Sequence, residues 1–174
     1  ESSLEEYIEQ LCVVFDEVYR ITKDDGTFWL NIGDCYANKG EIPSDGRKGF
    51  SGTGGMGTAD KTIEGLTTKD LIGVPWRVAF ALQQRGWILR SDIIWAKKNP
   101  IPESVKDRPT SSHEHIFLFS KQPKYYYDFE SVKEKIINLD NNGGYEHRNK
   151  RDVWRVRGAS YPGSHCATFP MELI

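Results

Sequence analysis

The fold follows from one stretch, Trp87-Ile88-Leu89-Arg90-Ser91-Asp92-Ile93-Ile94-Trp95, whose β-branched and aromatic side chains are typical of a strand. A second apolar run, His115-Ile116-Phe117-Leu118-Phe119, follows a turn that contains Pro100 and Pro102. Two such runs on either side of a Pro-rich turn indicate an antiparallel pair. We therefore expect a β-hairpin in the second half of the chain.

A helix and a strand are predicted before this hairpin. Apolar residues recur at three- and four-residue steps between Leu4 and Val18, as in an amphipathic helix, and Ser3 with Glu6 fits a capping box. The apolar run 27–32 then indicates a buried strand that ends just before Asp34. A carboxylate at a strand's carboxyl end lies where α/β proteins usually bind ligands, although Asp is also common in turns. Both interpretations of Asp34, pocket wall and turn cap, stay open.

Residues 35–66 are rich in Gly, Ser, Asp and Lys, and we expect a flexible Gly-rich loop there. A loop of this length in a compact domain is typical of a functional flap or of a segment ordered by a partner, and plain disorder is the alternative. Beyond it, Thr67 and Asp70 offer a cap for a helix that begins near Pro75 and ends at Gly86. The predicted order is helix, strand, helix, strand, strand.

Composition restricts the class of protein. A chain of 174 residues is long enough for one domain with one core. Its net charge of −2 predicts no overall basic surface, so nucleic acid would have to be bound by local clusters. Three cysteines without a Cys-x-x-Cys pair argue against a disulfide framework or a zinc site and fit a reducing cytosol. Without an apolar run near ~18 residues or a leader, we expect a cytoplasmic protein that neither spans a membrane nor is exported.

The last ten residues, His165-Cys166-Ala167-Thr168-Phe169-Pro170-Met171-Glu172-Leu173-Ile174, fit the pattern His-x-Ala-x-Phe-Pro-x-x-Leu-Ile at every fixed position. This pattern resembles the donor-binding signature of site-specific DNA methyltransferases that modify N4 of cytosine or N6 of adenine, in the arrangement with the target-base half before the donor half. The segments 95–104 and 107–114 are similar to that family's hairpin turn beside the target base. The resemblance implies an α/β fold, a partial doubly wound (Rossmann-like) methyltransferase sheet with a terminal β-hairpin and flanking helices.

Two motifs of that family are missing from this sequence. One is the Ser-Pro-Pro-Tyr or Asp-Pro-Pro-Tyr tetrapeptide, which supplies the acceptors for the target amine, and the other is Asp-Pro-Phe with a Gly-rich turn. We therefore interpret residues 1–174 as a single partial methyltransferase domain, an internal fragment that we expect to be inactive alone. A sheet separated from its central strands exposes an apolar edge, so we also expect the fragment to self-associate.

The resemblance and the positions of polar residues together predict three groups of site residues. The residues expected at the target base are Asp34, Asn99 and His113. The residues expected at the donor, S-adenosylmethionine, are His165, Thr168, Phe169 and Pro170. The residues expected to contact duplex DNA around a flipped base are Lys97, Lys98, Arg108, Ser112, Arg148, Lys150 and Arg151. The last three lie in the interval 129–163, which in the family hosts part of the DNA-reading region, and an ordinary solvated polar face is the alternative.

Other interpretations of the chain are weaker but stay open. His113 and His115 would share one face of a strand and Glu114 the other, but two imidazoles do not make a metal site, and we expect none. Glu114 is instead expected to anchor Arg108 or a backbone amide. A DNA-binding or assembly module without chemistry is the main rival function. Methylation of RNA or protein is disfavoured because the turn from 99 to 114 resembles the DNA enzymes.

Overall fold

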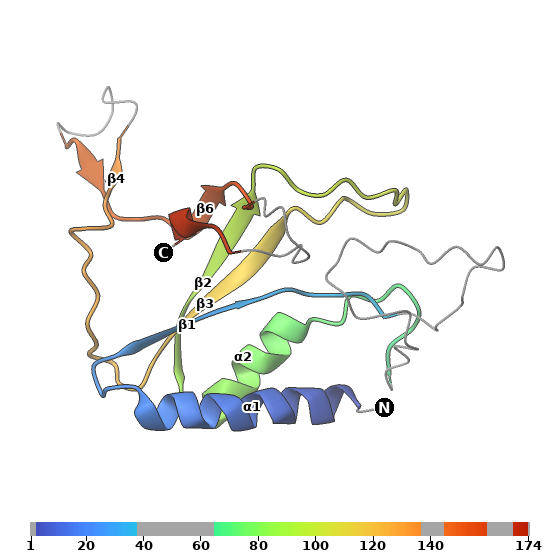
Figure 1. Cartoon of the computed structure of the whole chain (residues 1–174), viewed down its shortest axis with the longest axis horizontal. Helices are drawn as coiled ribbons and strands as arrows, with labels where there is room; N and C mark the ends of the chain where they lie inside the picture. Colours follow the sequence, from blue (N-terminus) through green and yellow to red (C-terminus); the bar gives the residue numbers. More distant parts are fainter. Residues whose placement is uncertain (1–2, 38–64, 137–144, 160–168, 174) are drawn as a thin grey trace.

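The computed structural model describes residues 3–37, 65–136, 145–159 and 169–173 (Figure 1). The elements in chain order are α1 (Leu4–Ile21), β1 (Thr27–Ile32), α2 (Val74–Gln84), β2 (Ile88–Lys97), β3 (His113–Ser120), β4 (Glu134–Lys135), β5 (His147–Arg148), β6 (Val153–Val156) and the 3-10 helix η2 (Met171–Leu173). The predicted order of helix, strand, helix, strand, strand is confirmed up to Ser120. Within the described ranges, no helix combines the length and the apolar character that crossing a bilayer requires.

Four strands form one mixed sheet in the order β1-β3-β2-β6. The strand β3 lies between β1 and β2 and is antiparallel to both, with Phe117 opposite Leu30 and Ile116 opposite Ile93. The predicted hairpin of β2 and β3 is thereby confirmed. The strand β6 pairs parallel with β2, with Trp154 opposite Trp95. Because β1, β2 and β6 run in the same direction, their carboxyl ends lie at one edge of the sheet.

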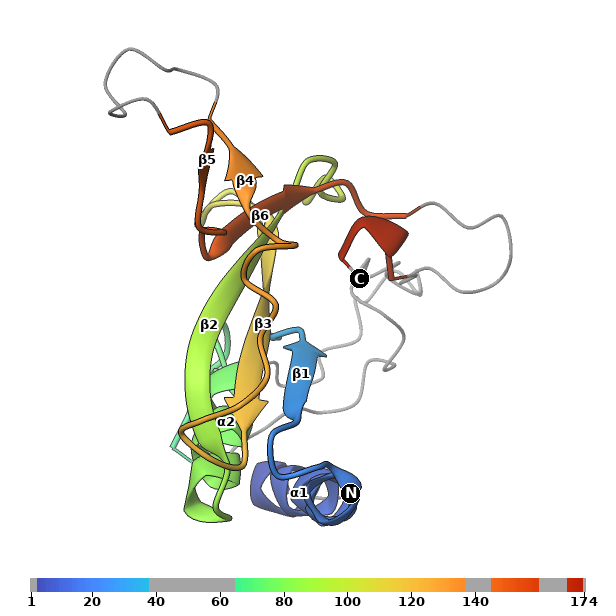
Figure 2. The same cartoon turned by 90° about the vertical axis from the view of Figure 1, so that its left-hand side faces the viewer.

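One face of the sheet is covered by α1 and α2 (Figures 1 and 2). Side chains alternate between the two faces along a strand, so Phe117 and Phe119 of β3 lie on the same face. They join Cys12 of α1 and Leu82 of α2 in the main core, where all four are fully buried. Burying a Phe or Leu side chain stabilises a fold by about 2 kcal/mol, which makes this helix–sheet interface the principal source of stability.

The two helices begin in different ways. The capping box of α1 is confirmed, since Ser3 Oγ accepts a hydrogen bond from the Glu6 backbone at 3.1 Å and the Ser3 N–H donates to Glu6 Oε2 at 3.0 Å. The cap predicted for α2 is wrong. Thr67 and Asp70 bond to each other in a turn before the helix, whereas the N-cap of α2 is Gly73 at φ 75°, a left-handed conformation that favours glycine.

The other face of the sheet carries a second, smaller core. Ile93, Trp95, Ile116 and Leu118 are buried there, packed against Trp154 and Val156 of β6 and Leu173 of η2. In Figure 2, η2 and α2 lie on opposite sides of the sheet. The strand β6 was not predicted from the sequence, although its alternation of half-buried Trp154 and Val156 with exposed neighbours is a strand signal.

A short two-stranded hairpin, β4–β5, projects from the sheet (Figure 1). Its antiparallel register sets Glu134 opposite Arg148 and Lys135 opposite His147. In Figure 2 the segment that follows β3 rises along the sheet and leads into this hairpin, and β6 follows directly after it. The interval predicted to be part of the DNA-reading region therefore contains the projecting hairpin and the strand that rejoins the sheet.

Candidate functional site

Asp34 follows β1 and faces the first turn of α2. Its Oδ1 accepts hydrogen bonds from the backbone N–H groups of Cys35 at 2.8 Å, Gly73 at 3.0 Å and Val74 at 3.0 Å. The first N–H groups of a helix have no partner within the helix, and negative charge is favoured there. This geometry supports the interpretation of Asp34 as a cap. Its contact with a target base stays a prediction.

The segments on either side of the predicted Gly-rich loop are hydrogen bonded to each other. The Ala37 N–H donates to the Asp70 carbonyl at 2.8 Å, and the Ile72 N–H donates to the Cys35 carbonyl at 3.0 Å. These bonds bring the two sides of the loop together just beyond the carboxyl end of β1. The predicted flap itself concerns residues 38–64, which lie outside the described residues.

The turn between β2 and β3, residues 98–112, extends beyond the carboxyl edge of the sheet (Figure 1). Arg108 holds this turn in shape, because its Nη1 donates to Glu103 Oε2 at 2.7 Å. Its guanidinium also lies 4.2 Å from the centre of the Tyr36 ring. The Arg108 hydrogen bond lowers the pKa of Glu103 below its ordinary value. Arg108 therefore has internal partners, and its predicted phosphate contact is untested.

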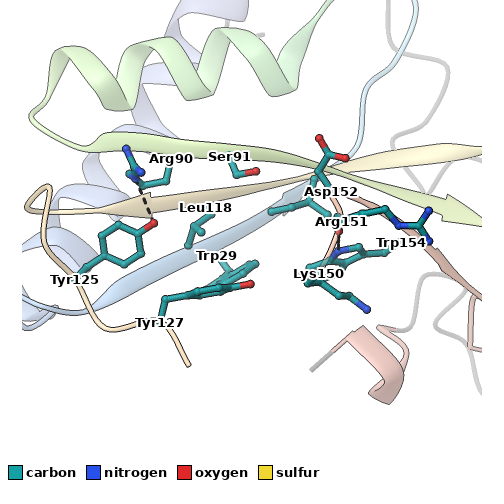
Figure 3. Close-up of a pocket in the computed structure, with 11 residues that line it drawn as sticks. Trp29, Arg90, Ser91, Leu118, Tyr125, Tyr127, Lys150, Arg151, Asp152 and Trp154 are labelled. Carbon is teal, nitrogen blue, oxygen red and sulfur yellow. Dashed lines mark hydrogen bonds between the residues drawn. The ribbon is translucent and has the colours of Figure 1, made fainter. Parts of the chain in front are cut away.

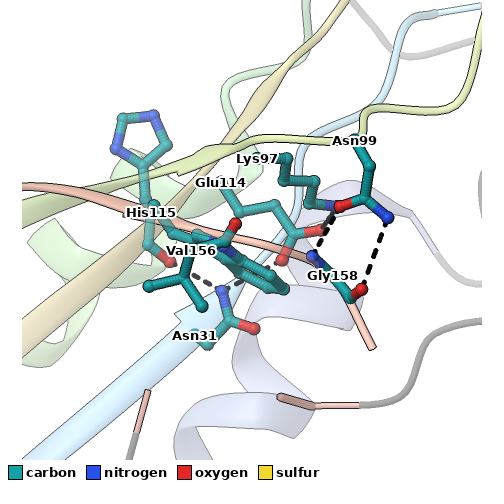
Figure 4. A network of polar contacts seen from close by, with 8 residues as sticks. Asn31, Lys97, Asn99, Glu114, His115, Val156 and Gly158 are labelled. Atoms are coloured by element: carbon teal, nitrogen blue, oxygen red, sulfur yellow. Dashed lines mark hydrogen bonds and ion pairs between the residues drawn. The ribbon is translucent and has the colours of Figure 1, made fainter. Parts of the chain in front are cut away.

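A polar network crosses the neighbouring strands β1, β3 and β2 at the edge of the sheet where β1 and β2 end (Figure 4). Lys97 of β2 forms an ion pair with Glu114 of β3. Asn31 of β1 donates from Nδ2 to Glu114 Oε2 at 3.0 Å and to the His115 carbonyl at 3.1 Å. The prediction that Glu114 anchors Arg108 or a backbone amide is wrong, because its partners are the side chains of Lys97 and Asn31. No role was predicted for Asn31 from the sequence.

Asn99, at the start of the 98–112 turn, is bonded to the chain just after β6 (Figure 4). Its Oδ1 accepts from the Gly158 N–H at 2.7 Å, and its Nδ2 donates to the Gly158 carbonyl at 3.4 Å. The Lys98 backbone N–H donates to the Val156 carbonyl at 3.3 Å, while the Lys98 side chain is exposed. The end of β6 is thus fastened to the beginning of the turn.

His113 begins β3 at the same edge and is exposed. Its ring centre lies 5.5 Å from that of His115, whose Nδ1 is 2.8 Å from Asp92 Oδ1. The alternation predicted from sequence is confirmed, since His115 stacks on Phe117 of the helix-covered face while Glu114 joins the network on the other. Among the residues that the structure describes, no group of three His, Cys, Asp or Glu side chains could hold a metal ion.

The three residues predicted at the target base have three different sets of partners. Asp34 bonds to the start of α2, Asn99 bonds to Gly158, and the His113 ring contacts His115. They lie at the same edge of the sheet, but their described contacts do not join them into one cluster. Ser112, predicted nearby, is exposed, and its carbonyl accepts from the Lys97 N–H at 2.8 Å.

Two arginines of the predicted DNA contact share one carboxylate. Glu134 Oε2 accepts from Arg148 Nε at 3.2 Å and from Arg151 Nε at 2.9 Å, and Glu134 Oε1 accepts from the Arg151 N–H at 3.2 Å. Burial alone would raise the pKa of Glu134, but the bonds from Arg151 and Arg148 outweigh it and hold that pKa below its ordinary value. Lys150 lies 5.3 Å from the centre of the Trp154 ring. Phosphate contacts by these residues stay predictions.

The predicted donor segment is described in part. His165 and Thr168 lie outside the described residues. Pro170 is buried, while Phe169 is 46% exposed and its ring centre lies 6.3 Å from that of Trp95. Leu173 packs into the smaller core. The segment therefore lies on the face opposite the helices, beside the carboxyl end of β2.

A hollow of about 180 Å³ lies on the same face (Figure 3). Aromatic rings of Trp29, Tyr127 and Trp154 line it, together with Arg90, whose Nε donates to the Tyr125 hydroxyl at 3.2 Å. Trp29 and Trp154 face each other with ring centres 6.0 Å apart. Lys150 and Arg151, which the sequence predicts to contact DNA, also line the hollow, whereas no role was predicted for Trp29 or Arg90, which are distant from them along the chain.

Comparison with known proteins assigns the family. The N6_N4_Mtase family model, described as DNA methylase, matches residues 1–174. The chain belongs to this DNA methylase family. The Type II methyltransferase M.Cfr9I of Citrobacter freundii is 49% identical over 176 residues, an alignment that covers 100% of this methylase chain and 56% of the relative. M.SmaI of Serratia marcescens is 52% identical, with coverage of 99% and 58%. The methylase chain thus spans little more than half the length of these relatives.

A solved structure shows the same fold. The PvuII DNA methyltransferase (cytosine-N4-specific) matches with a TM-score of 0.58 at 15% identity, covering 92% of the methylase chain and 45% of the PvuII chain. The α/β methyltransferase sheet with its β-hairpin and flanking helices, predicted from sequence, is thereby confirmed. The interpretation of residues 1–174 as a single partial methyltransferase domain stays a prediction.

Proposed function

We propose that the intact protein transfers a methyl group from S-adenosylmethionine to an exocyclic amine, N4 of cytosine or N6 of adenine, in duplex DNA. The observation that carries this proposal is the meeting of two segments at the carboxyl end of β2. Phe169 of the predicted donor segment contacts Trp95, and the turn that is expected beside the target base begins at Lys98. A donor and an acceptor amine must lie close together for direct transfer.

The described part of the donor segment fits this cofactor. When bound, S-adenosylmethionine supplies an electrophilic methyl group attached to a sulfonium. The target amine takes up this methyl group and loses a proton. Phe169 is half exposed, so one part of its ring is free to face a ligand while Trp95 supports another. Aromatic rings attract cations, which suits a sulfonium. His165 and Thr168 are proposed to complete the donor site.

The DNA would lie against the 98–112 turn and the β4–β5 hairpin. Lys98 and Lys150 have exposed side chains and are the better candidates for phosphate contacts, since Arg148 and Arg151 share Glu134. A base must leave the stack before its amine can be methylated, and we propose that Asp34, Asn99 and His113 line the space around it. The substrate would be cytoplasmic DNA, as expected for a partner of a restriction enzyme.

Methyl transfer by the protein expressed from its complete open reading frame tests this proposal. Labelled donor is incubated with a plasmid, and the modified nucleosides are identified by mass spectrometry as N4-methylcytosine or N6-methyladenine. The isolated 174-residue chain is expected to transfer no methyl group. Absence of incorporation into every duplex tested would refute the proposal. Salt-sensitive DNA retention without donor binding would then favour the rival DNA-binding module.

A further inference from the structure

The strand β6 contacts, at its two ends, both segments that the proposed function assigns to DNA. At its carboxyl end, the Val156 carbonyl accepts hydrogen bonds from the Lys98 N–H at 3.3 Å and from Trp95 Nε1 at 3.0 Å. Gly158, two residues further, is bonded twice to Asn99 (Figure 4). This end of β6 therefore holds the start of the turn beside the target base.

The amino end of β6 is joined to the β4–β5 hairpin. Trp154 Nε1 donates to the Arg151 carbonyl at 2.7 Å, and Arg151 in turn bonds to Glu134 of β4 through both its N–H and its Nε. Arg148 of β5 bonds to the same carboxylate. The Glu134 side chain is only 17% exposed, so this carboxylate is enclosed by the two arginines at the root of the hairpin.

Between these ends, β6 is a paired strand and not a loop. Its residues pair with β2 from Ile94 opposite Val153 to Lys97 opposite Val156. A paired strand has few accessible conformations, whereas loops are mobile. The strand therefore holds the groups at its two ends at a more constant distance from each other than a loop would. The four residues of β6 span about 13 Å at the usual rise per residue. The hairpin and the turn are thus separated by one short strand that is bonded at both ends.

We propose that Glu134 is a specificity-determining positioning residue, which fixes the β4–β5 hairpin relative to the turn beside the target base. It holds Arg148 and Arg151 on the hairpin and through Arg151 connects them to β6. It also neutralises charge that would otherwise bind any phosphate. Glu134 touches no reacting atom in this role. The inference rests on the proposed function and adds to it the residue that couples sequence reading to methylation.

If Glu134 has this role, its substitution should increase the affinity for DNA, whereas a substitution that only destabilised the fold would decrease it. In Glu134→Gln the two arginines lose their charged partner and become free to bind phosphates. DNA of any sequence should then bind more tightly, and the salt dependence of log K should steepen by about 1 to 2, as one or two further phosphates are neutralised. Discrimination between the recognition sequence and a site with one changed base, measured as a ratio of kcat/KM values, should fall by about 10-fold or more.

The experiment compares intact wild type, Glu134→Gln, Trp154→Phe and their double variant, with the recognition sequence read from the plasmid positions that wild type methylates. Trp154→Phe removes the hydrogen bond to the Arg151 carbonyl, so it should also lower discrimination. The loss of discrimination in the double variant, expressed as a free energy, should be smaller than the sum of the losses in the two single variants. Glu130→Gln is the control, because the ion pair described for Glu130 is with Lys133, three residues away on the same turn, and not with an arginine of the hairpin. Unchanged discrimination in an active, folded Glu134→Gln protein would overturn the inference. An inactive wild type would instead overturn the proposed function.

Discussion

Asp34 Oδ1 lies 3.0 Å from the backbone nitrogen of Val74, so a carboxylate at the end of β1 caps a helix that begins 40 residues later. This bond joins the carboxyl edge of the sheet to α2, which packs on the helix-covered face. A capping side chain usually comes from the residue just before the helix. Here that position is Gly73, which has no side chain to offer. The cap is therefore a tertiary contact.

Removing this cap should destabilise the chain. Asp34→Ala leaves the N–H groups of Gly73 and Val74 without their acceptor, and we expect a loss of about 1–2 kcal/mol in the free energy of unfolding. Asp34→Asn keeps an oxygen acceptor and should lose less. Denaturant-induced unfolding of the 174-residue chain measures both variants. Asp24→Ala, in the exposed turn after α1, is the control, and equal stability of all variants would contradict the capping role.

The hydrogen bond and ion pair of Glu114 should contribute modestly to the free energy of unfolding, because Glu114 is only partly buried. Glu114→Ala leaves Lys97 and the Asn31 amide without this partner, and we expect a loss of about 1 kcal/mol, because the ion pair is partly exposed to solvent. Glu114→Gln retains an acceptor for Asn31 and should lie between wild type and Glu114→Ala. Chemical unfolding of the three proteins tests this order. Equal losses in the two variants would show that only the charge of Glu114 matters.

The Glu103–Arg108 bond should make the 98–112 turn sensitive to acid. Since Arg108 lowers the pKa of Glu103 from its ordinary value of 4.5, the folded state binds this proton less readily than the unfolded state. The stabilisation is fully present above pH 4.5 and is lost as the pH falls through the lowered pKa. Glu103→Gln should therefore lower stability at neutral pH but hardly at low pH. Thermal unfolding from neutral pH to below 4.5 measures the difference.

Phe169 should contribute to donor affinity in the intact protein. Phe169→Ala removes the half-exposed ring beside Trp95, and we expect the Kd for S-adenosylmethionine to rise by about 10-fold, the equivalent of one strong cation–π contact. Isothermal titration with the donor measures this. Met171→Ala is a suitable control, because Met171 is 83% exposed in the same segment. A donor affinity that Phe169→Ala leaves unchanged would exclude the ring from the donor site.

The fragment should self-associate through the free edge of β1. In the described sheet β1 is an outer strand, and its Trp29 side chain is 39% exposed. Unpaired edges bearing apolar side chains favour pairing with a second copy. We expect a concentration-dependent mass above 19.9 kDa in light scattering, and a lower one for Trp29→Lys, since lysine on an edge strand disfavours association. A monomeric mass for the wild-type fragment would contradict this.

Short-range patterns were sufficient to predict both helices, the first three strands of the chain and the capping box of α1. The reason is that each signal lies within a few residues, as with Ser3 and Glu6. Such a local signal does not depend on how the rest of the chain is folded. The position of Asp34 just beyond β1 was predictable too, because the apolar run 27–32 shows where that strand ends. Lys97, Asn99 and His113 were assigned to the site by the resemblance of their segments to the family's hairpin turn, and their roles stay predictions.

What the sequence by itself determined was thus both helices, the strands β1, β2 and β3, and the family. Only the tertiary structure decided the partners: Asp34 with α2, Glu114 with Asn31 83 residues away, and β6 with β2. The physical reason is that a hydrogen bond or ion pair between distant residues depends on the chain path that brings them together. The residue pattern within one segment does not show which distant segment it will contact.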